Sequence, residues 1–345
     1  MIKPQRLKKG DTVAIVSLSS GLGGEPAFQH RYEIGRARLE TEFGLRVITM
    51  PNALKGIDYI YNNPAARAAD LMDAFRDESI KAIICMIGGD DTIRLLPHID
   101  FDIIRQNPKI FLGYSDSTAN HFMMHKAGLV SFYGPCILCE FAENVAMHEY
   151  TKEYLQKVLF DPTPELLIAP SPVWTSELLP WENAENNKIA RTMTPDAKGF
   201  ELLQGAGISR GRLLGGCLDV LPMIIGTSIW PVGEEWDNAI LFLETSEDKP
   251  SPDNVKWILR GLAAQGIIDR ISGVLFGKPQ GEAYYEEYKQ VLLRVVGTEC
   301  NRPNLPILYN VNFGHNSPIC TIPYGIMAEI DCNARSFKLL ETATI

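Results

Sequence analysis

Apolar runs with strand periodicity alternate with helical stretches along the first half of the chain. Helical patterns such as residues 31–43 and 65–76 lie between the predicted strands, which cover residues 12–16, 46–50, 82–86 and 110–112. Strands that alternate with helices usually pair in parallel, so the pattern predicts a doubly wound α/β sheet. Ligands of such sheets bind beyond the carboxyl ends of the strands, and the loops at those ends are therefore the first candidates for a site.

The second half contains further strand-like runs, with helical patterns between the earlier ones. The runs cover residues 239–244, 273–276 and 307–313, and a closing pair at 326–331 and 336–340 is a hairpin candidate. Between the halves, residues 161–206 are rich in proline and polar side chains, which is typical of a linker or a long inter-domain loop. We therefore predict an N-terminal α/β domain (1–165), a linking segment (166–205) and a C-terminal domain (206–345).

Composition narrows the class of protein. A chain of 345 residues with 46% hydrophobic residues is long enough for about two globular domains. The net charge of −9 and the lack of a basic stripe disfavour nucleic acid as a partner. No stretch approaches the roughly 20 apolar residues of a membrane span, and the basic N-terminus lacks an apolar signal core, so we expect no membrane partner and a cytoplasmic location.

The seven cysteines are odd in number and scattered through apolar segments, which favours reduced, buried thiols over a disulfide framework. Cys136 and Cys139 have C-x-x-C spacing, but no second pair accompanies them. His121 and His125 have helical i, i+4 spacing without the glutamate of an HExxH motif. We therefore expect no metal site.

Residues 109–120 contain the most distinctive local pattern, an apolar run that turns at Ser115 into a helical segment. A sharp strand-to-helix turn exposes a serine hydroxyl, and the free N–H groups that follow, beginning with Asp116, point to where an oxyanion would form. The pattern is G-x-S-x-S rather than G-x-S-x-G. A second interpretation, that Asp116 or Ser117 caps the helix, stays open on this fragment alone.

A nucleophilic serine needs a base and an orienting acid. Of six histidines, His315 is distinctive because it ends the strand-like run 307–315. Glu244 is the one carboxylate at the end of the apolar run 239–244. Burial of a carboxylate there is costly without a partner. A salt bridge or a cap at the helix near Pro252 would also account for this residue. Ser115, Glu244 and His315 thus each lie at the mouth of a predicted strand.

Together these segments resemble the LD-carboxypeptidase family of serine peptidases, and within it the microcin C immunity (MccF-like) branch more than the muropeptide-trimming branch. The matching motifs cover nearly the whole chain: residues 87–97, 113–118, 215–221 with 226–227, 241–244, 314–315 and 322–325. The resemblance implies Ser115 as nucleophile, Glu244 as acid and His315 as base, with the oxyanion held by the N–H groups of Asp116 and Gly89. It also implies a small β-rich, barrel-like second domain, a site in the inter-domain cleft, no cofactor and a homodimer.

The substrate is open between two classes. An MccF-like enzyme would cleave the bond between an acidic aminoacyl group and a nucleotide-like moiety, whereas the alternative would remove a terminal D-alanine from a muropeptide. Trp174 and Trp181 in the polar segment, which either pack on a neighbouring domain or stack on a substrate ring, favour the first class together with residues 244–252.

Two departures from the family bear on specificity. Cys217 stands where many relatives have Asn, and Gln280 stands where some have an acid for a substrate amino group. We expect Cys217, Lys278 and Gln280 to contact the substrate. A different class of protein is also possible on the sequence alone: a non-catalytic protein that binds an anion at residues 88–89 and at the helix that begins near Ser117.

Overall fold

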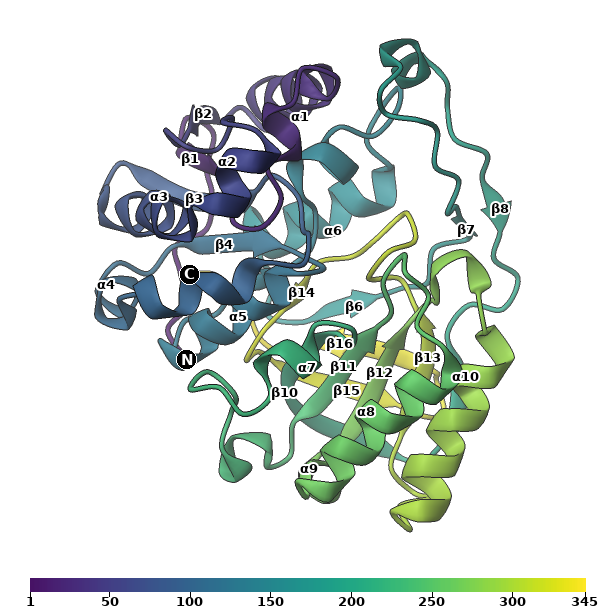
Figure 1. Ribbon diagram of the computed structural model, residues 1–345. Coiled ribbons are helices and arrows are strands. Elements are labelled where there is room, and N and C mark those ends of the chain that lie inside the picture. The colour runs from purple at the N-terminus through teal and green to yellow at the C-terminus, as the bar shows by residue number, and fades with distance from the viewer.

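The computed structural model describes residues 1–345 and contains two main sheets, each in its own lobe (Figure 1). The first sheet has the strand order β14-β5-β4-β3-β1-β2. Five strands pair in parallel, and the edge strand β14 (Ile322–Pro323) is antiparallel to β5. The parallel strands are β1 (Thr12–Val16), β2 (Arg46–Thr49), β3 (Ile80–Cys85), β4 (Ile110–Gly113) and β5 (Phe132–Tyr133).

Helices connect the strands of this sheet, as the alternating pattern predicts. They are α1 (Gln29–Thr41), α2 (Ile57–Asn62), α3 (Pro64–Arg76), α4 (Phe101–Gln106), α5 (Ser117–Lys126) and α6 (Glu149–Leu159), with η1 (Leu22–Gly24), η2 (Thr92–His98) and η3 (Ile137–Phe141) as turns that are not α-helical. Strand β4 is buried throughout and β3 nearly so, which is expected of central strands in a parallel sheet covered on both faces. The predicted doubly wound α/β class is confirmed.

The second sheet has the order β6-β16-β15-β10-β11-β12-β13-β9. Its four central strands are parallel: β10 (Ile208–Cys217), β11 (Ile240–Glu244), β12 (Gly273–Gly277) and β13 (Ile307–Val311). The helical connections are α7 (Leu221–Ile224), η5 (Gly233–Trp236), α8 (Pro252–Ala264), α9 (Ile267–Arg270), η6 (Gln280–Glu282), α10 (Tyr285–Leu292) and η7 (Leu293–Glu299). The predicted closing hairpin forms antiparallel β15 (Met327–Asp331) and β16 (Ser336–Leu339).

The predicted linking segment 166–205 is partly built into the second sheet. Its ends form the two edge strands β6 (Leu166–Ile168) and β9 (Glu201–Gln204). Between them the chain makes a long excursion, in which β7 (Val173–Trp174) pairs with β8 (Thr194–Pro195) around η4 (Ala184–Lys188). We call residues 173–195 the arm; Figure 1 shows it running along one side of the molecule, beside both lobes.

The two lobes share one core, and one strand of the C-terminal half lies in the first sheet. Ninety-three buried apolar residues from both sheets form a single connected cluster. Strand β14 comes from the C-terminal half but completes the first sheet, and the chain ends meet where Arg6 N–H donates to Ile345 O at 2.9 Å. No helix in the structure is both long and apolar enough to cross a membrane. The predicted domain limits stay predictions, and β14 does not follow them, because it lies within residues 206–345 but pairs in the first sheet.

Candidate active site

Ser115 occupies a strained turn between β4 and α5. Its φ of 61° lies in the left-handed region, which is uncommon for a residue with a side chain and is typical of functional turns. Gly88, in the loop after the neighbouring strand β3, packs directly on this turn. A Cβ atom added to Gly88 would lie 2.8 Å from Ser115 Cβ and 3.0 Å from its Oγ, so this approach requires glycine.

Three strand ends bring the predicted serine, acid and histidine together. His315 Nε2 lies 3.0 Å from Ser115 Oγ, and His315 Nδ1 lies 2.7 Å from Glu244 Oε2. Glu244 ends β11 and is fully buried, and His315 follows β13 through Gly314. A Cβ atom on Gly314 would lie 2.5 Å from Glu244 Oε2, so only glycine lets the chain pass this close to the acid. The three side chains therefore form a continuous polar chain across the two sheets.

Tyr133, at the end of β5, also belongs to this set of hydrogen-bonded side chains, and the sequence did not indicate it. Its hydroxyl donates to Glu244 Oε1 and accepts the Ser115 N–H at 3.1 Å. Burial first, and then the charge of Glu244, raise the pKa of Tyr133 well above 10, so the hydroxyl keeps its proton. One phenol thus fixes both the acid and the serine turn. Nothing in the two-residue strand that carries it distinguishes Tyr133 from any other core tyrosine.

Glu247 is a second residue that sequence reasoning missed. Its Oε2 lies 3.1 Å from His315 Nε2, so the imidazole stands between two carboxylates. Burial alone would lower the pKa of His315, but Glu244 and Glu247 outweigh it and raise that pKa well above 6.5. The hydrogen bond to His315 in turn lowers the pKa of Glu247 to about 2. Its only sequence signal is its place three residues after Glu244.

The backbone around the serine has free donors where an oxyanion would form. The N–H groups of Asp116 and Gly89 donate to no acceptor within the protein. The Asp116 side chain makes no capping bond to α5, contrary to the capping interpretation. It is buried instead, where it accepts from Ser19 Oγ at 2.6 Å and from the N–H groups of Asp91 and Thr92 at 3.0 and 2.8 Å. Asp116 thereby ties the loop after β3 to the serine turn.

A pocket of about 360 Å³ opens beside these groups. Of the residues predicted to contact the substrate, Trp181 and Gln280 line it. Trp181 lies on the Arg31 guanidinium, 4.2 Å from ring centroid to carbon, and Gln280 Oε1 is buried without a partner in the protein. Its wall includes Ser115, His315, Gly88, Gly89, Tyr114, Glu140, Glu143, Glu177, Arg191 and Glu247.

The other three predicted contacts do not line this pocket. Lys278 is 1% exposed and pairs with Asp196 at 3.4 Å and Glu282 at 2.9 Å, and its Nζ lies 4.4 Å from the Trp174 ring centroid. The Lys278 ammonium group thus packs on the Trp174 indole, and this contact stabilises the structure instead of binding a ligand. Cys217 is also buried, behind the Glu244 and His315 pair, and its N–H donates to Thr118 Oγ1 at 2.9 Å. The Cys217 thiol is therefore close to Glu244 and His315, but it does not line the pocket in which a substrate would bind.

Two groups of side chains have potential metal-binding atoms within 4.8 Å of one another: Cys136 with Cys139 and Glu140, and Cys217 with Glu244 and His315. The second would compete with the serine for the histidine. In the first, burial raises the pKa values of Cys136 and Glu140, and the Glu140 carboxyl accepts from Tyr114 and from the Cys136 N–H. Side chains that already serve internal hydrogen bonds, and whose proton loss burial disfavours, are poor ligands, so we assign neither set of side chains to a metal.

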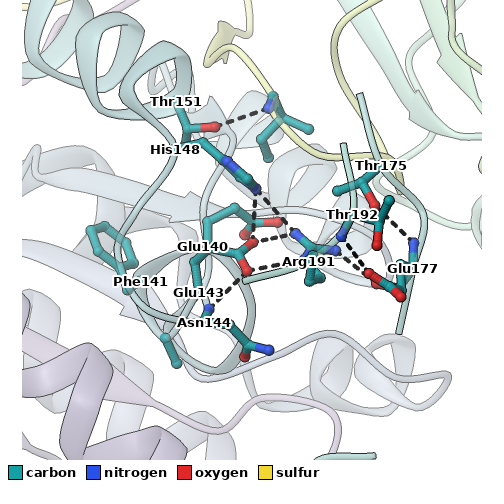
Figure 2. A network of polar contacts seen from close by, with 12 residues as sticks. Glu140, Phe141, Glu143, Asn144, His148, Thr151, Thr175, Glu177, Arg191 and Thr192 are labelled. Carbon is teal, nitrogen blue, oxygen red and sulfur yellow. Dashed lines mark hydrogen bonds and ion pairs between the residues drawn. The ribbon is translucent and has the colours of Figure 1, made fainter. Parts of the chain in front are cut away.

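Ionic contacts of the arm, drawn in Figure 2, involve the pocket-lining residues Glu143, Glu177 and Arg191. Arg191 donates from Nε to Glu143 Oε1 at 3.0 Å and from a second nitrogen to Oε2, and His148 Nε2 lies 3.1 Å from the same carboxylate. Burial would raise the pKa of Glu143, but its hydrogen bonds and the charges of His148 and Arg191 lower it to about 2. Glu177 accepts the Thr192 N–H and closes the base of the arm. This network holds the segment that carries Trp181.

Two family descriptions match this chain. The LD-carboxypeptidase N-terminal domain matches residues 13–134, and the LD-carboxypeptidase C-terminal domain matches residues 210–330. The chain belongs to the LD-carboxypeptidase family. This confirms the resemblance inferred from the motifs and places the protein in a family of peptidases. The N-terminal match includes Ser115 and the C-terminal match includes Glu244 and His315.

Relatives from both branches of the family are similar over nearly the full chain. The microcin C7 self-immunity protein MccF of Escherichia coli is 28% identical over 97% of this chain and 94% of its own. A probable murein peptide carboxypeptidase of Bacillus subtilis is 30% identical over 95% of this chain and 91% of its own.

Solved structures agree with the fold. An MccF-like protein from Streptococcus pneumoniae, in complex with AMP, has a TM-score of 0.88 and 38% identity over 96% of this chain and 98% of its own. MccF in complex with aspartyl sulfamoyl adenosine has a TM-score of 0.86 and 26% identity, with both chains fully covered.

Proposed function

We propose that this protein is a serine amidase in which Ser115 is the nucleophile, His315 the general base and Glu244 the acid that orients the imidazole. The observation that carries the proposal is the unbroken polar chain from Ser115 Oγ through both nitrogens of His315 to the buried Glu244. A hydroxyl next to a base that is itself held by a carboxylate is the arrangement of an activated nucleophile. A protein that only binds anions would not need these linked contacts between Ser115, His315 and Glu244.

In the proposed reaction His315 Nε2 accepts the Ser115 proton as Oγ attacks the carbonyl carbon. The negative oxygen that forms is held by the N–H groups of Asp116 and Gly89, which have no other acceptor. When the carbonyl reforms, the bond to the leaving nitrogen breaks and His315 returns the proton to that nitrogen. Water then attacks the acyl-enzyme by the same route, which releases the acid and restores the serine.

We infer an MccF-like substrate, in which an acidic aminoacyl group is joined to a nucleotide-like moiety. Support comes from the complexes of MccF with aspartyl sulfamoyl adenosine and glutamyl sulfamoyl guanosine, and from AMP on the relative that is 38% identical. The pocket wall contains the indole of Trp181, a surface suited to stacking on a base. We also infer a homodimer, for which the family resemblance is the basis.

Cleavage of a cell-wall peptide is the second candidate, because the Bacillus subtilis relative at 30% identity is a probable murein peptide carboxypeptidase. Mass spectrometry of two incubations separates the candidates: aspartyl sulfamoyl adenosine, and a tetrapeptide ending in D-alanine. We expect cleavage of the adenosine compound, and loss of at least about 10³-fold in rate in Ser115→Ala. Cleavage of the tetrapeptide alone would move the protein to cell-wall recycling. Equal rates in wild type and Ser115→Ala would contradict the serine mechanism.

A further inference from the structure

Glu247 competes with Ser115 for the same nitrogen of His315. The Nε2 atom lies 3.0 Å from Ser115 Oγ and 3.1 Å from Glu247 Oε2, while Nδ1 is held by Glu244. Two carboxylates beside one imidazole favour its protonated form, and a protonated imidazole cannot accept the serine proton. The contact with Glu247 therefore opposes the base role of His315 in the free enzyme.

Other charged groups of the pocket wall have structural partners. Glu143 is paired with Arg191 and His148, Glu140 accepts from Tyr114 and the Cys136 N–H, and Glu177 accepts from the Thr192 N–H. Glu247 has His315 as its one ion-pair partner. It is the pocket carboxylate that can exchange its partner without breaking a structural contact.

The loop that carries Glu247 allows this exchange. Ser246, the preceding residue, is buried and its N–H donates to Asp219 Oδ2 at 2.7 Å, which anchors the start of the loop. The Glu247 side chain is 67% exposed. A rotation of this side chain alone moves the carboxylate, and the anchored backbone keeps it at the mouth of the site.

We propose that Glu247 binds the α-ammonium group of an aminoacyl substrate and that this contact releases His315 for catalysis. The inference rests on the proposed aminoacyl substrate. The α-nitrogen of such a group is one carbon away from the carbonyl that Ser115 attacks, so it arrives beside the atoms that Glu247 already touches. The ammonium keeps its proton and replaces the imidazolium as the partner of Glu247. The imidazolium releases its Nε2 proton to water and becomes the neutral base.

This exchange also selects substrates. A compound without the α-ammonium leaves Glu247 on His315 and meets an inactive base. Gln280, which lines the same pocket and is neutral, cannot supply the missing charge. Because an acylated α-nitrogen carries no charge, internal peptide bonds are disfavoured by the same rule.

The pH dependence of the reaction can separate the effect of Glu247 on His315 from the effects of the other groups that face this histidine. Those groups are Glu244, Asp219, Tyr114, Tyr133 and Cys217, and all of them are buried or largely buried. Glu247→Gln removes one carboxylate from the imidazole and leaves this buried set intact. The pKa of His315 in the free enzyme should then fall, and the acidic limb of kcat/KM should move to lower pH.

The test compares aspartyl sulfamoyl adenosine with succinyl sulfamoyl adenosine, which lacks only the α-ammonium, across pH 5 to 9. We expect wild type to prefer the aspartyl compound by about tenfold or more in kcat/KM. Glu247→Gln should lose that preference and cleave the succinyl compound at lower pH than wild type does. Asp248→Asn, which removes a neighbouring exposed carboxylate, is the matched control and should behave as wild type.

Each outcome separates this inference from the proposed function. Equal cleavage of the two compounds by wild type, or a preference that persists in Glu247→Gln, overturns the role of Glu247 and leaves the serine mechanism standing. Cleavage of neither compound by wild type, together with no labelling of Ser115 by a fluorophosphonate, overturns the proposed function itself.

Discussion

At the scale of single residues, the Tyr133 hydroxyl joins the acid to the serine turn. Tyr133→Phe leaves Glu244 Oε1 without its donor in a fully buried place and frees the Ser115 N–H. We expect kcat to fall by about tenfold or more with little change in KM, because the acid and serine lose alignment while the pocket wall stays intact. Steady-state kinetics on the preferred substrate measure both constants.

Tyr309→Phe is the matched control for this substitution. Tyr309 is also fully buried, and its hydroxyl donates to Tyr285 O at 2.9 Å, away from the triad. Both variants should lose stability of about 1 kcal/mol, but only Tyr133→Phe should lose kcat. An equal loss of activity in the two variants would show that the effect is one of folding and not of alignment.

Residues at strand ends were predictable, and residues defined by tertiary contacts were not. Ser115, Glu244 and His315 interrupt or end apolar runs. A polar residue in such a place is conspicuous in the sequence alone, and it points to a function. Tyr133 and Glu247 gain their roles only because distant segments fold against them. The same limit affects Lys278 and Trp174, whose residue types suggest substrate binding although they pack on each other and Lys278 pairs with Asp196 and Glu282.

At the scale of elements, the arm is held to the first lobe through Glu143. The pKa of this carboxyl is about 2 in the folded protein and ordinarily 4.5, so its ion pairs stabilise the docked arm fully above pH 4.5. That contribution is lost as the pH falls toward 2. Glu143→Gln should produce the same loosening at neutral pH, because the neutral amide pairs poorly with Arg191.

We expect faster proteolysis between residues 176 and 192 in Glu143→Gln, and a several-fold rise in KM for the proposed adenosine substrate as Trp181 loses its fixed position. The kcat should change less, because the triad lies outside the arm. Glu185→Gln is the control: it removes an acid from the same arm, but its ion pair with Lys188 is 71% exposed on each side. Digestion patterns that do not differ between the two variants would argue against anchoring by Glu143.

The segment 166–205 shows why short edge strands escape sequence analysis. Strands β6 and β9 have three and four residues, and the chain between them contains four prolines. A run this short carries no periodicity, and it forms a strand because a neighbouring strand offers free hydrogen-bonding groups. The long central strands, in contrast, follow from their own apolar patterns.

At the scale of the whole molecule, the proposed site exists only when both lobes are docked. Ser115 follows a strand of the first sheet, Glu244 ends a strand of the second, and His315 follows another strand of the second. The lobes share one connected core and meet at close backbone contacts, such as the Cys217 N–H that donates to Thr118 Oγ1. We therefore expect wild type to unfold in a single transition by fluorescence and by circular dichroism, with activity lost in the same transition.

Gly216→Ala tests this coupling at the contact itself. Gly216 has a φ of 135°, and a Cβ atom there would lie 2.6 Å from Thr118 Oγ1 and 2.7 Å from the Tyr324 hydroxyl, so Thr118 and Tyr324 must give way at the place where the lobes meet. We expect a loss of about 2 to 4 kcal/mol in stability and a large fall in kcat, since Ser115 separates from the acid and base.

Gly226→Ala separates backbone strain from this clash. Gly226 also has a positive φ, of 82°, but an added Cβ atom would meet nothing within 4 Å. Its substitution should therefore cost only the strain of a left-handed alanine and leave kcat unchanged. Thermal unfolding and kinetics on the two variants decide the matter: equal losses in both, or two resolved transitions in wild type, would mean that the lobes are independent. A larger loss in Gly216→Ala, with one transition throughout, would mean that the contact between the lobes both stabilises the fold and aligns the proposed triad.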